Sequence, residues 1–427
     1  MNPFFDALSR QLNAPERRRP RQRHARAKAF QCVCGQRVFF NNTECLNCHR
    51  QLGFDPRHGH IVALDPGKTE GAWIEAGRVR GRIFKRCANF SSPAACNWLL
   101  PAARADHLCI ACGLNRTIPD LSVPGNGTLW RKVESAKRQV IAQLLTLGLP
   151  IPRARTPGDG GLAFDLLAPP DDGSPLLTGH GQGLITLNIH EADDAYRVQV
   201  REAMHEPYRT LVGHFRHEIG HFYWDRLVAG GPWLAPFRQV FGDERDDYAQ
   251  ALRRHYDQGA PADWAQRFIS AYASSHPWED WAETWAHYLH MADTADTALS
   301  FGIDAANVEL TSDLFEPADL WQPDHPDAAK FLDFLNGWVR LTNVLNELSR
   351  SMGQPDFYPF VLPRAAVGKL QFIHQVVTQR EGPQETPPAP AEPPQAAEDT
   401  SDPQAPAAST DDAGAPPQEG ALSPLTA

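Results

Sequence analysis

The stretch GHFRHEIGHFYWD, residues 213–225, contains the pentapeptide HEIGH from His217 to His221. On a helix, residues four apart lie on the same face, so the two imidazoles can each offer one nitrogen to a single metal ion. Glu218 lies beside the first histidine, where its carboxylate can take a proton from a water molecule bound to that metal. The stretch therefore predicts a zinc-binding helix with Glu218 as the general base.

The residues around this pentapeptide indicate a buried helix. Burying two histidines and a glutamate there would be costly without a metal ion or polar partners. A five-residue pattern also arises by chance, so the prediction depends on a third protein ligand, which catalytic zinc sites require beside an open position for water. The apolar and aromatic residues that indicate burial are Phe215, Ile219, Phe222 and Leu227.

The segment HPWEDWAETWAHYLH, residues 276–290, offers the third ligand. Pro277 fits the start of a helix, on which Glu279, Glu283 and His287 stack at spacings of four. Three tryptophans within eight residues leave little of this helix for solvent. We predict that Glu279 is the zinc ligand and that Glu283 orients a ligand histidine. The reverse assignment of the two glutamates stays open.

All eight cysteines lie between residues 29 and 122 and fall into two groups of four. Short C-x-C and C-x-x-C pairs hold two thiolates on one tight turn, and two such pairs make the tetrahedral site of a structural zinc. We predict two structural zinc ions rather than a disulfide framework, because no secretory signal precedes the cysteines. The groups are Cys32, Cys34, Cys45 and Cys48, and then Cys87, Cys96, Cys109 and Cys112.

The net charge of -10 is unevenly distributed. Residues 1–30 carry eight Lys or Arg and two acids, whereas residues 381–427 carry nine acids and no Lys or Arg. We predict a flexible basic arm at 1–28 and a disordered Pro/Ala-rich acidic tail at 381–427, since neither composition can bury a core. The charge supports no general attraction to nucleic acid or membranes, and no run is long and apolar enough for a membrane helix. We expect a soluble cytoplasmic protein.

The rest of the chain shows helical and strand patterns. Short runs bounded by Gly, Pro and Asp predict strands at 161–168 and 183–189. Apolar residues spaced by three and four predict helices at 129–150, 235–256, 261–274, 278–292 and 326–350.

The spacing of these motifs resembles known zinc peptidases. H-E-x-x-H followed about 60 residues on by E-x-x-x-E resembles the gluzincin class, although Glu283 stands where thermolysin-like members have Asp. Trp224 and Leu227 exclude the metzincin pattern, which needs Gly and His there. EDWAE, with a tyrosine seven residues before its first Glu, is similar to the catalytic helix of lethal-factor-type toxin peptidases. That resemblance implies Glu279 as zinc ligand and Tyr272 as donor to the oxyanion.

Residues 29–380 as a whole resemble a bacterial family of zinc-binding metallopeptidases with an N-terminal zinc ribbon. The resemblance implies an α+β fold: a β-rich double zinc-ribbon module at 29–122, and a zincin-like, mainly helical metallopeptidase domain with a small edge sheet at 123–380. The segments that carry it are FQCVCGQRVFFNNTECLNCHRQLGF, CGLNRTIPDLS, GHFRHEIGHFYWDRLV and HPWEDWAETWAHYLH.

Zincins place a strand before the active-site helix, and the edge of that strand holds an extended peptide by strand addition. GLITLNIHEA falls at that place in this chain. The resemblance therefore implies a substrate strand formed by Leu184, Ile185, Thr186, Leu187 and Asn188.

We expect a zinc-dependent peptidase with one catalytic and two structural zinc ions. A zinc hydrolase of another amide or an ester is an alternative, because no sequence feature shapes a pocket. A zinc-ribbon binding or scaffold protein with an inactive zincin domain is a second alternative, which the intact Glu218 disfavours. The expected partners are a peptide or protein substrate and a protein that the ribbons could recruit. Nucleic acid is not expected, since the cysteine-rich region has no clear basic and aromatic face.

Overall fold

The computed structural model describes residues 28–379 except 157, 171–175, 177, 204–205, 207, 304, 306–307 and 309–314, together with residue 382. These residues belong to one unit, Met1–Glu385. Apart from residues 28 and 382, the predicted arm and tail lie outside the described residues. Their flexibility therefore stays a prediction.

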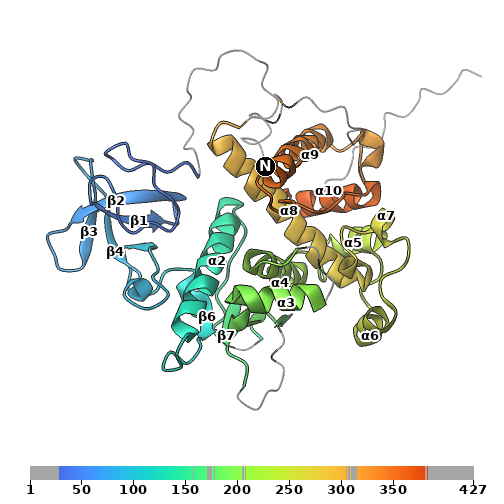
Figure 1. The fold of residues 1–427 in the computed structure, drawn as a ribbon, viewed down its shortest axis with the longest axis horizontal. Coiled ribbons are helices and arrows are strands. Elements are labelled where there is room, and N and C mark those ends of the chain that lie inside the picture. Colours follow the sequence, from blue (N-terminus) through green and yellow to red (C-terminus); the bar gives the residue numbers. More distant parts are fainter. Residues whose placement is uncertain are drawn as a thin grey trace, which may run out of the picture. The chain divides into compact units, whose positions relative to one another are not determined.

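The cysteine-rich region contains an antiparallel sheet in which each strand pairs with the next along the chain (Figure 1). Gly59, with φ at 63°, lies in the tight reversal between the first two strands, where a glycine adopts this left-handed backbone without strain. The strands are β1 (Gln51–Asp55), β2 (His60–Pro66), β3 (Ala72–Glu75), β4 (Ile83–Arg86) and β5 (Leu99–Pro101).

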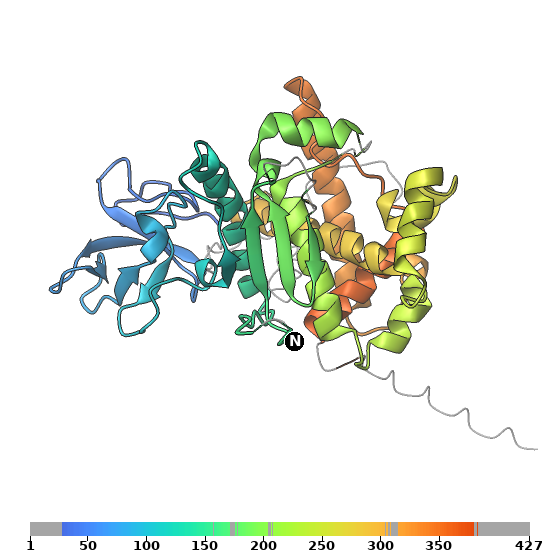
Figure 2. The same ribbon diagram turned by 90° about the horizontal axis from the view of Figure 1, so that it is seen from below.

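A second, smaller sheet has the strand order β6-β7-β9-β8 (Figure 2). Strands β6, β7 and β9 run parallel, and β8 runs antiparallel to β9. The two strands predicted from the sequence are β7 and β9, which confirms both. The bounds are β6 (Asn115–Thr117), β7 (Ala163–Leu167), β8 (Gly179–Gly181) and β9 (Leu184–Asn188).

Helices make up most of the residues that the structure describes after residue 125. Helix α8 contacts α4, α5, α9 and α10, and Figure 1 shows it running through the middle of the helical part. The longer helices are α2 (Asn126–Thr146), α4 (Leu211–Leu227), α8 (Pro277–Ser300), α9 (Ala328–Ser351) and α10 (Arg364–Thr378). The shorter ones are α3 (Asp194–Ala203), α5 (Leu234–Phe241), α6 (Tyr248–Gln258) and α7 (Trp264–Arg267).

Two predicted helices were wrong in extent. The single helix expected at 235–256 is divided into α5 and α6, because Gly242 ends α5 with φ at 106° and the Asp247 side chain caps α6. The helix expected at 261–274 is reduced to α7 and a short 3-10 turn, Tyr272–Ser274.

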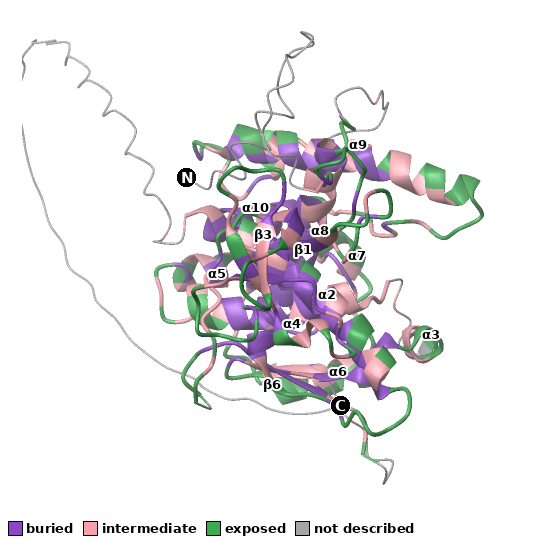
Figure 3. Ribbon diagram, turned by 90° about the vertical axis from the view of Figure 1, so that its left-hand side faces the viewer, coloured by how far each residue is buried: buried purple, intermediate pink, exposed green. Residues whose placement is uncertain are grey.

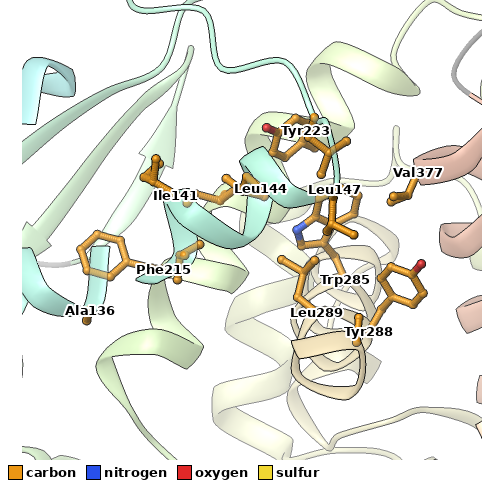
Figure 4. Close-up of a cluster of buried hydrophobic side chains, with 14 of the residues drawn as sticks. Ala136, Ile141, Leu144, Leu147, Phe215, Tyr223, Trp285, Tyr288, Leu289 and Val377 are labelled. Carbon is orange, nitrogen blue, oxygen red and sulfur yellow. The ribbon is translucent and has the colours of Figure 1, made fainter. Parts of the chain in front are cut away.

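Burial is concentrated where α2, α4, α8 and α10 meet, whereas the end of α9 is exposed (Figure 3). The same buried cluster continues into the cysteine-rich region, from Phe30 to Val377. The predicted α+β class is confirmed, while the predicted domain boundaries stay predictions. Figure 4 shows the centre of the cluster, with Ile141 and Leu144 from α2, Phe215 and Tyr223 from α4, and Trp285 and Leu289 from α8.

In the part of the chain that the structure describes, no helix is both long and apolar enough to cross a membrane. The predicted cytoplasmic location stays a prediction.

Helices α4 and α8 approach each other closely at Gly220. A Cβ placed on Gly220 would lie 3.1 Å from the Ala282 Cα and 3.2 Å from the Trp285 ring. The indole nitrogen of Trp281 donates a hydrogen bond of 2.8 Å to the Gly220 carbonyl oxygen. Packing therefore favours a glycine at this point of the helix crossing.

Gly220→Val is expected to lower the free energy of unfolding by about 1–3 kcal/mol, because a branched side chain must enter a contact that a Cβ alone already fills. The control Ala329→Val places the same side chain on an exposed position of α9 and should change it by less than about 0.5 kcal/mol. Urea denaturation measures both values. Equal effects of the two variants would contradict the close contact.

Candidate active site

Helices α4 and α8 bring together donor atoms of His217, His221 and Glu279. These atoms all lie within 4.8 Å of one another. The Oε2 atom of Glu279 is 3.0 Å from Nε2 of His217 and 3.5 Å from Nε2 of His221. Glu279 reaches this point from the first turn of α8, which the ring nitrogen of His276 caps by accepting the Trp278 N–H at 3.1 Å.

The donor set fits a bound cation. Oε2 of Glu279 is buried and makes no hydrogen bond, because neither imidazole meets it with hydrogen-bond geometry despite the short distances. Nδ1 of His217 lies 2.7 Å from a carboxylate oxygen of Glu283 and donates to it, so in the neutral ring Nε2 carries a lone pair. Buried lone pairs that converge on one point are costly unless a positive charge lies between them.

The electrostatics of the site also favour a positive charge. Burial opposes protonation of His217, but the adjacent carboxylates of Glu279 and Glu283 outweigh it and hold its pKa well above the usual range. Burial would raise the pKa of the Glu279 carboxyl group, yet the charges of His221 and His217 beside it lower that pKa well below its usual range. A metal ion competes with protons for such sites, and it binds the neutral imidazole.

Glu283 lies on the far side of His217 from Glu279. Its Oε1 atom contacts Nδ1 of His217, and its Oε2 atom accepts a 2.7 Å hydrogen bond from the Ser270 hydroxyl. This chain of contacts fixes the tautomer and the orientation of the imidazole. Ser270 was not recognised in the sequence, because a serine in a loop carries no signal of its role.

Tyr248 is the second residue that sequence reasoning missed. Its hydroxyl donates a 2.7 Å hydrogen bond to Oε1 of Glu279, the oxygen that faces away from the histidine nitrogens. The tyrosine ends the run GDERDDY, whose adjacent acids suggest a solvated surface. Only the folded chain brings the first residue of α6 to the first turn of α8.

Glu218 lies on α4 with the two predicted histidine ligands, and Tyr272 lies in the 3-10 turn that precedes α8. The Glu218 side chain follows His217 on α4 and is buried, and this burial raises the pKa of its carboxyl group. The Tyr272 ring centroid lies 6.0 Å from that of His217. Burial raises the pKa of the Tyr272 hydroxyl, so the phenol stays protonated and keeps a proton to donate.

The predicted substrate strand, Leu184–Asn188, is strand β9, and its assignment as a sheet edge is wrong. β9 pairs with β7 on one side and with β8 on the other, so both of its edges are occupied. Among the described strands, the free edge beside it belongs to β8. The ring of His180 in β8 stacks against that of His221 at 6.1 Å, which places this edge strand next to the converging donors.

The first cysteine group is formed by two tight turns with sulfur atoms facing each other. Cys32 and Cys48 are 3.6 Å apart, and Cys34 and Cys45 are 3.7 Å apart. Tetrahedral zinc with Zn–S bonds of about 2.3 Å separates its sulfurs by about 3.8 Å, so the cage has the right size. A hydrogen bond from the Gln36 backbone lowers the pKa of Cys34 to about 6, which favours the thiolate that binds metal.

The second cysteine group is buried against helix α2. All four of its cysteines are buried, and Cys96 and Cys109 are 3.7 Å apart. The Cys112 sulfur lies 3.9 Å from a carboxylate oxygen of Glu134, which forms a buried 2.6 Å ion pair with Lys137. Both cysteine groups are therefore arranged as four-sulfur cages, as the sequence predicts, and neither contains a disulfide.

The fold and these donor groups define a metalloprotein with a zinc-ribbon region followed by a helical part that carries H-E-x-x-H. The chain belongs to the family described as "Putative zinc-binding metallo-peptidase", whose model matches residues 126–376, and a zinc-ribbon domain matches residues 29–123. The family resemblance seen in the sequence is thereby confirmed.

Three relatives are each 41% identical over 353 residues, covering 82% of this chain and 95% of their own. They are an uncharacterized protein of Mycobacterium bovis and one from each of two strains of Mycobacterium tuberculosis. No solved structure matches the chain.

Purified protein is expected to hold about three zinc ions per chain, one for each donor group, and His217→Ala/His221→Ala about two. Elemental analysis after incubation with zinc and removal of free metal gives the count. The control His58→Ala/His60→Ala changes two histidines in the β1–β2 turn and at the start of β2, and it should keep all three zinc ions. The same count in wild type and in the His217/His221 variant would contradict a metal at HEIGH.

Proposed function

We propose that this protein is a zinc-dependent peptidase whose zinc is held by His217, His221 and Glu279. The observation that carries the proposal is the convergence of three donor atoms within 4.8 Å, from half-buried His217 and from buried His221 and Glu279, beside a buried carboxylate at Glu218. Three protein ligands with one position left open are typical of catalytic zinc sites, whereas structural sites are closed by four. Family membership supports the same class of reaction.

Zinc bound at these ligands would polarise a carbonyl group and lower the pKa of water, so that attack becomes feasible at neutral pH. Glu218 takes the proton from the attacking water and passes it to the leaving amine. Its raised pKa suits both transfers, since a carboxylate that binds a proton firmly is the better base. Glu283 and Ser270 hold the His217 ring in position during these steps.

Tyr272 donates to the oxygen on which negative charge develops in the transition state. Its phenol is protonated over the whole working pH range and lies on the His217 side of the site. The peptide would lie along the free edge of β8 rather than along β9, with its main chain paired to this three-residue strand. Cβ atoms on Gly179 and Gly181 would meet nothing within 4 Å, so the sheet face at these two glycines is open.

The two cysteine cages are proposed as structural zinc sites. Each has four sulfur ligands and no open position, which suits stability and not hydrolysis. The first cage carries exposed apolar side chains at Val33, Phe39 and Leu46, which could serve to recruit a protein partner.

Glu218→Gln is expected to lower the rate of peptide hydrolysis by about 10²–10⁴-fold, because the amide cannot accept the proton. Cleavage of a peptide library, read by mass spectrometry, measures the loss, and the zinc content should stay as in wild type. Glu202→Gln, at an exposed site on α3, is the matched control and should remain fully active. Undiminished cleavage by the Glu218 variant would exclude the proposed base.

Tyr272→Phe is expected to lower kcat by about 10²–10³-fold with little change in KM, since the lost hydrogen bond forms only in the transition state. Tyr256→Phe removes a hydroxyl from a tyrosine that is 59% exposed on α6, and it should retain wild-type kinetics. A Tyr272 variant that raises KM alone would assign this residue to substrate binding instead.

A further inference from the structure

The two oxygens of Glu279 have different surroundings. Oε2 faces Nε2 of both His217 and His221 and makes no hydrogen bond. Oε1 accepts the Tyr248 hydroxyl at 2.7 Å. The carboxylate is therefore held with one oxygen toward the histidines and the other toward α6.

Tyr248 is itself held firmly against the first turn of α8. Its ring makes edge contacts with His276 and Trp278, with centroids 5.2 Å and 5.6 Å away. The His276 ring also bonds to the Asp246 carbonyl oxygen at 3.1 Å, two residues before the tyrosine. The same histidine thus caps α8 and anchors the turn that delivers Tyr248.

The remainder of α6 contributes little to this placement. Ala251 is its one buried residue among those described, and most of its other side chains are exposed or half-buried. The contact with Glu279 is therefore the main polar link between this helix and the site. A tyrosine that served only to fill space would not need its hydroxyl within 2.7 Å of a buried carboxylate.

We propose that Tyr248 is a positioning residue for Glu279, which keeps Oε1 engaged so that Oε2 alone faces the metal. This inference rests on the proposed function of the same site. Without the hydroxyl, the carboxylate can rotate and offer both oxygens, which would occupy a coordination position that substrate or water needs. Tyr248 thus orients the glutamate ligand through a hydrogen bond, just as Glu283 orients the ring of His217.

The test compares Tyr248→Phe with Tyr256→Phe, which removes a hydroxyl from the same helix without touching Glu279. A chelator first removes the labile zinc while the cysteine cages keep theirs, and Zn²⁺ or Co²⁺ is then added back. Tyr248→Phe should bind Zn²⁺ about 10–100-fold more weakly than wild type, because the Glu279 carboxylate is no longer held in place before the metal binds. Its Co²⁺ form should absorb more weakly in the visible, as coordination by a second carboxylate oxygen predicts. Tyr256→Phe should match wild type in both measurements.

Wild-type affinity and an unchanged Co²⁺ spectrum in Tyr248→Phe would overturn the inference, as would equal losses in both variants. Thermal unfolding of the variants shows whether the fold is intact. The proposed function is tested separately by the wild type. A wild-type protein without a labile metal, or one whose Co²⁺ shows only thiolate absorption, would remove the peptidase proposal together with this inference. If the wild type binds labile zinc and cleaves peptides, the comparison of Tyr248→Phe with Tyr256→Phe tests the role of Tyr248 alone.

Discussion

The packing of α4 against α8 is the contact on which the site depends. The two histidines come from one helix and the glutamate from the other, so a shift of either helix would separate the donors. Gly220 lets the helices approach, and the Trp281 indole bonds to the carbonyl oxygen of that glycine. Ligands mounted on packed helices are held more accurately than ligands on loops. The fourth residue of HEIGH thus has a packing function, separate from the chemistry of its neighbours.

The site holds several carboxylates close together within a well-packed core, which is electrostatically unfavourable. Glu218 and Glu279 are both buried close to His217, and a third carboxylate, Glu283, contacts that histidine from the other side. Burying several carboxylates together weakens the folded state unless a cation compensates them. Functional sites of this kind commonly lower the free energy of unfolding in exchange for activity. The surrounding tryptophans and the close helix contact offset that cost.

Much of the candidate site follows from short-range spacing. HEIGH and Glu279 can be recognised because residues four apart on a helix lie on the same face. The cysteine groups can be recognised because closely spaced cysteine pairs form tight turns that hold a metal ion. Tyr248 and the edge strand β8 could not be found in this way. The tyrosine follows a run of acids, and β8 is a three-residue segment, Gly-His-Gly, with little strand propensity. Both acquire their place from contacts with distant segments.

The second cysteine cage limits how the ribbon region and the helical part could be exchanged independently during evolution. Its Cys112 lies against Glu134 of α2, and Arg138 of the same helix bonds to the Ala94 carbonyl oxygen in the ribbon region. Further along α2, Gln143 accepts hydrogen bonds from Arg216, the residue before the first histidine of HEIGH. One helix thus serves as a wall for the cage and as a support for α4. The ribbon region is part of the skeleton of the protein, and it could not be exchanged for another module unless α2 were rebuilt with it.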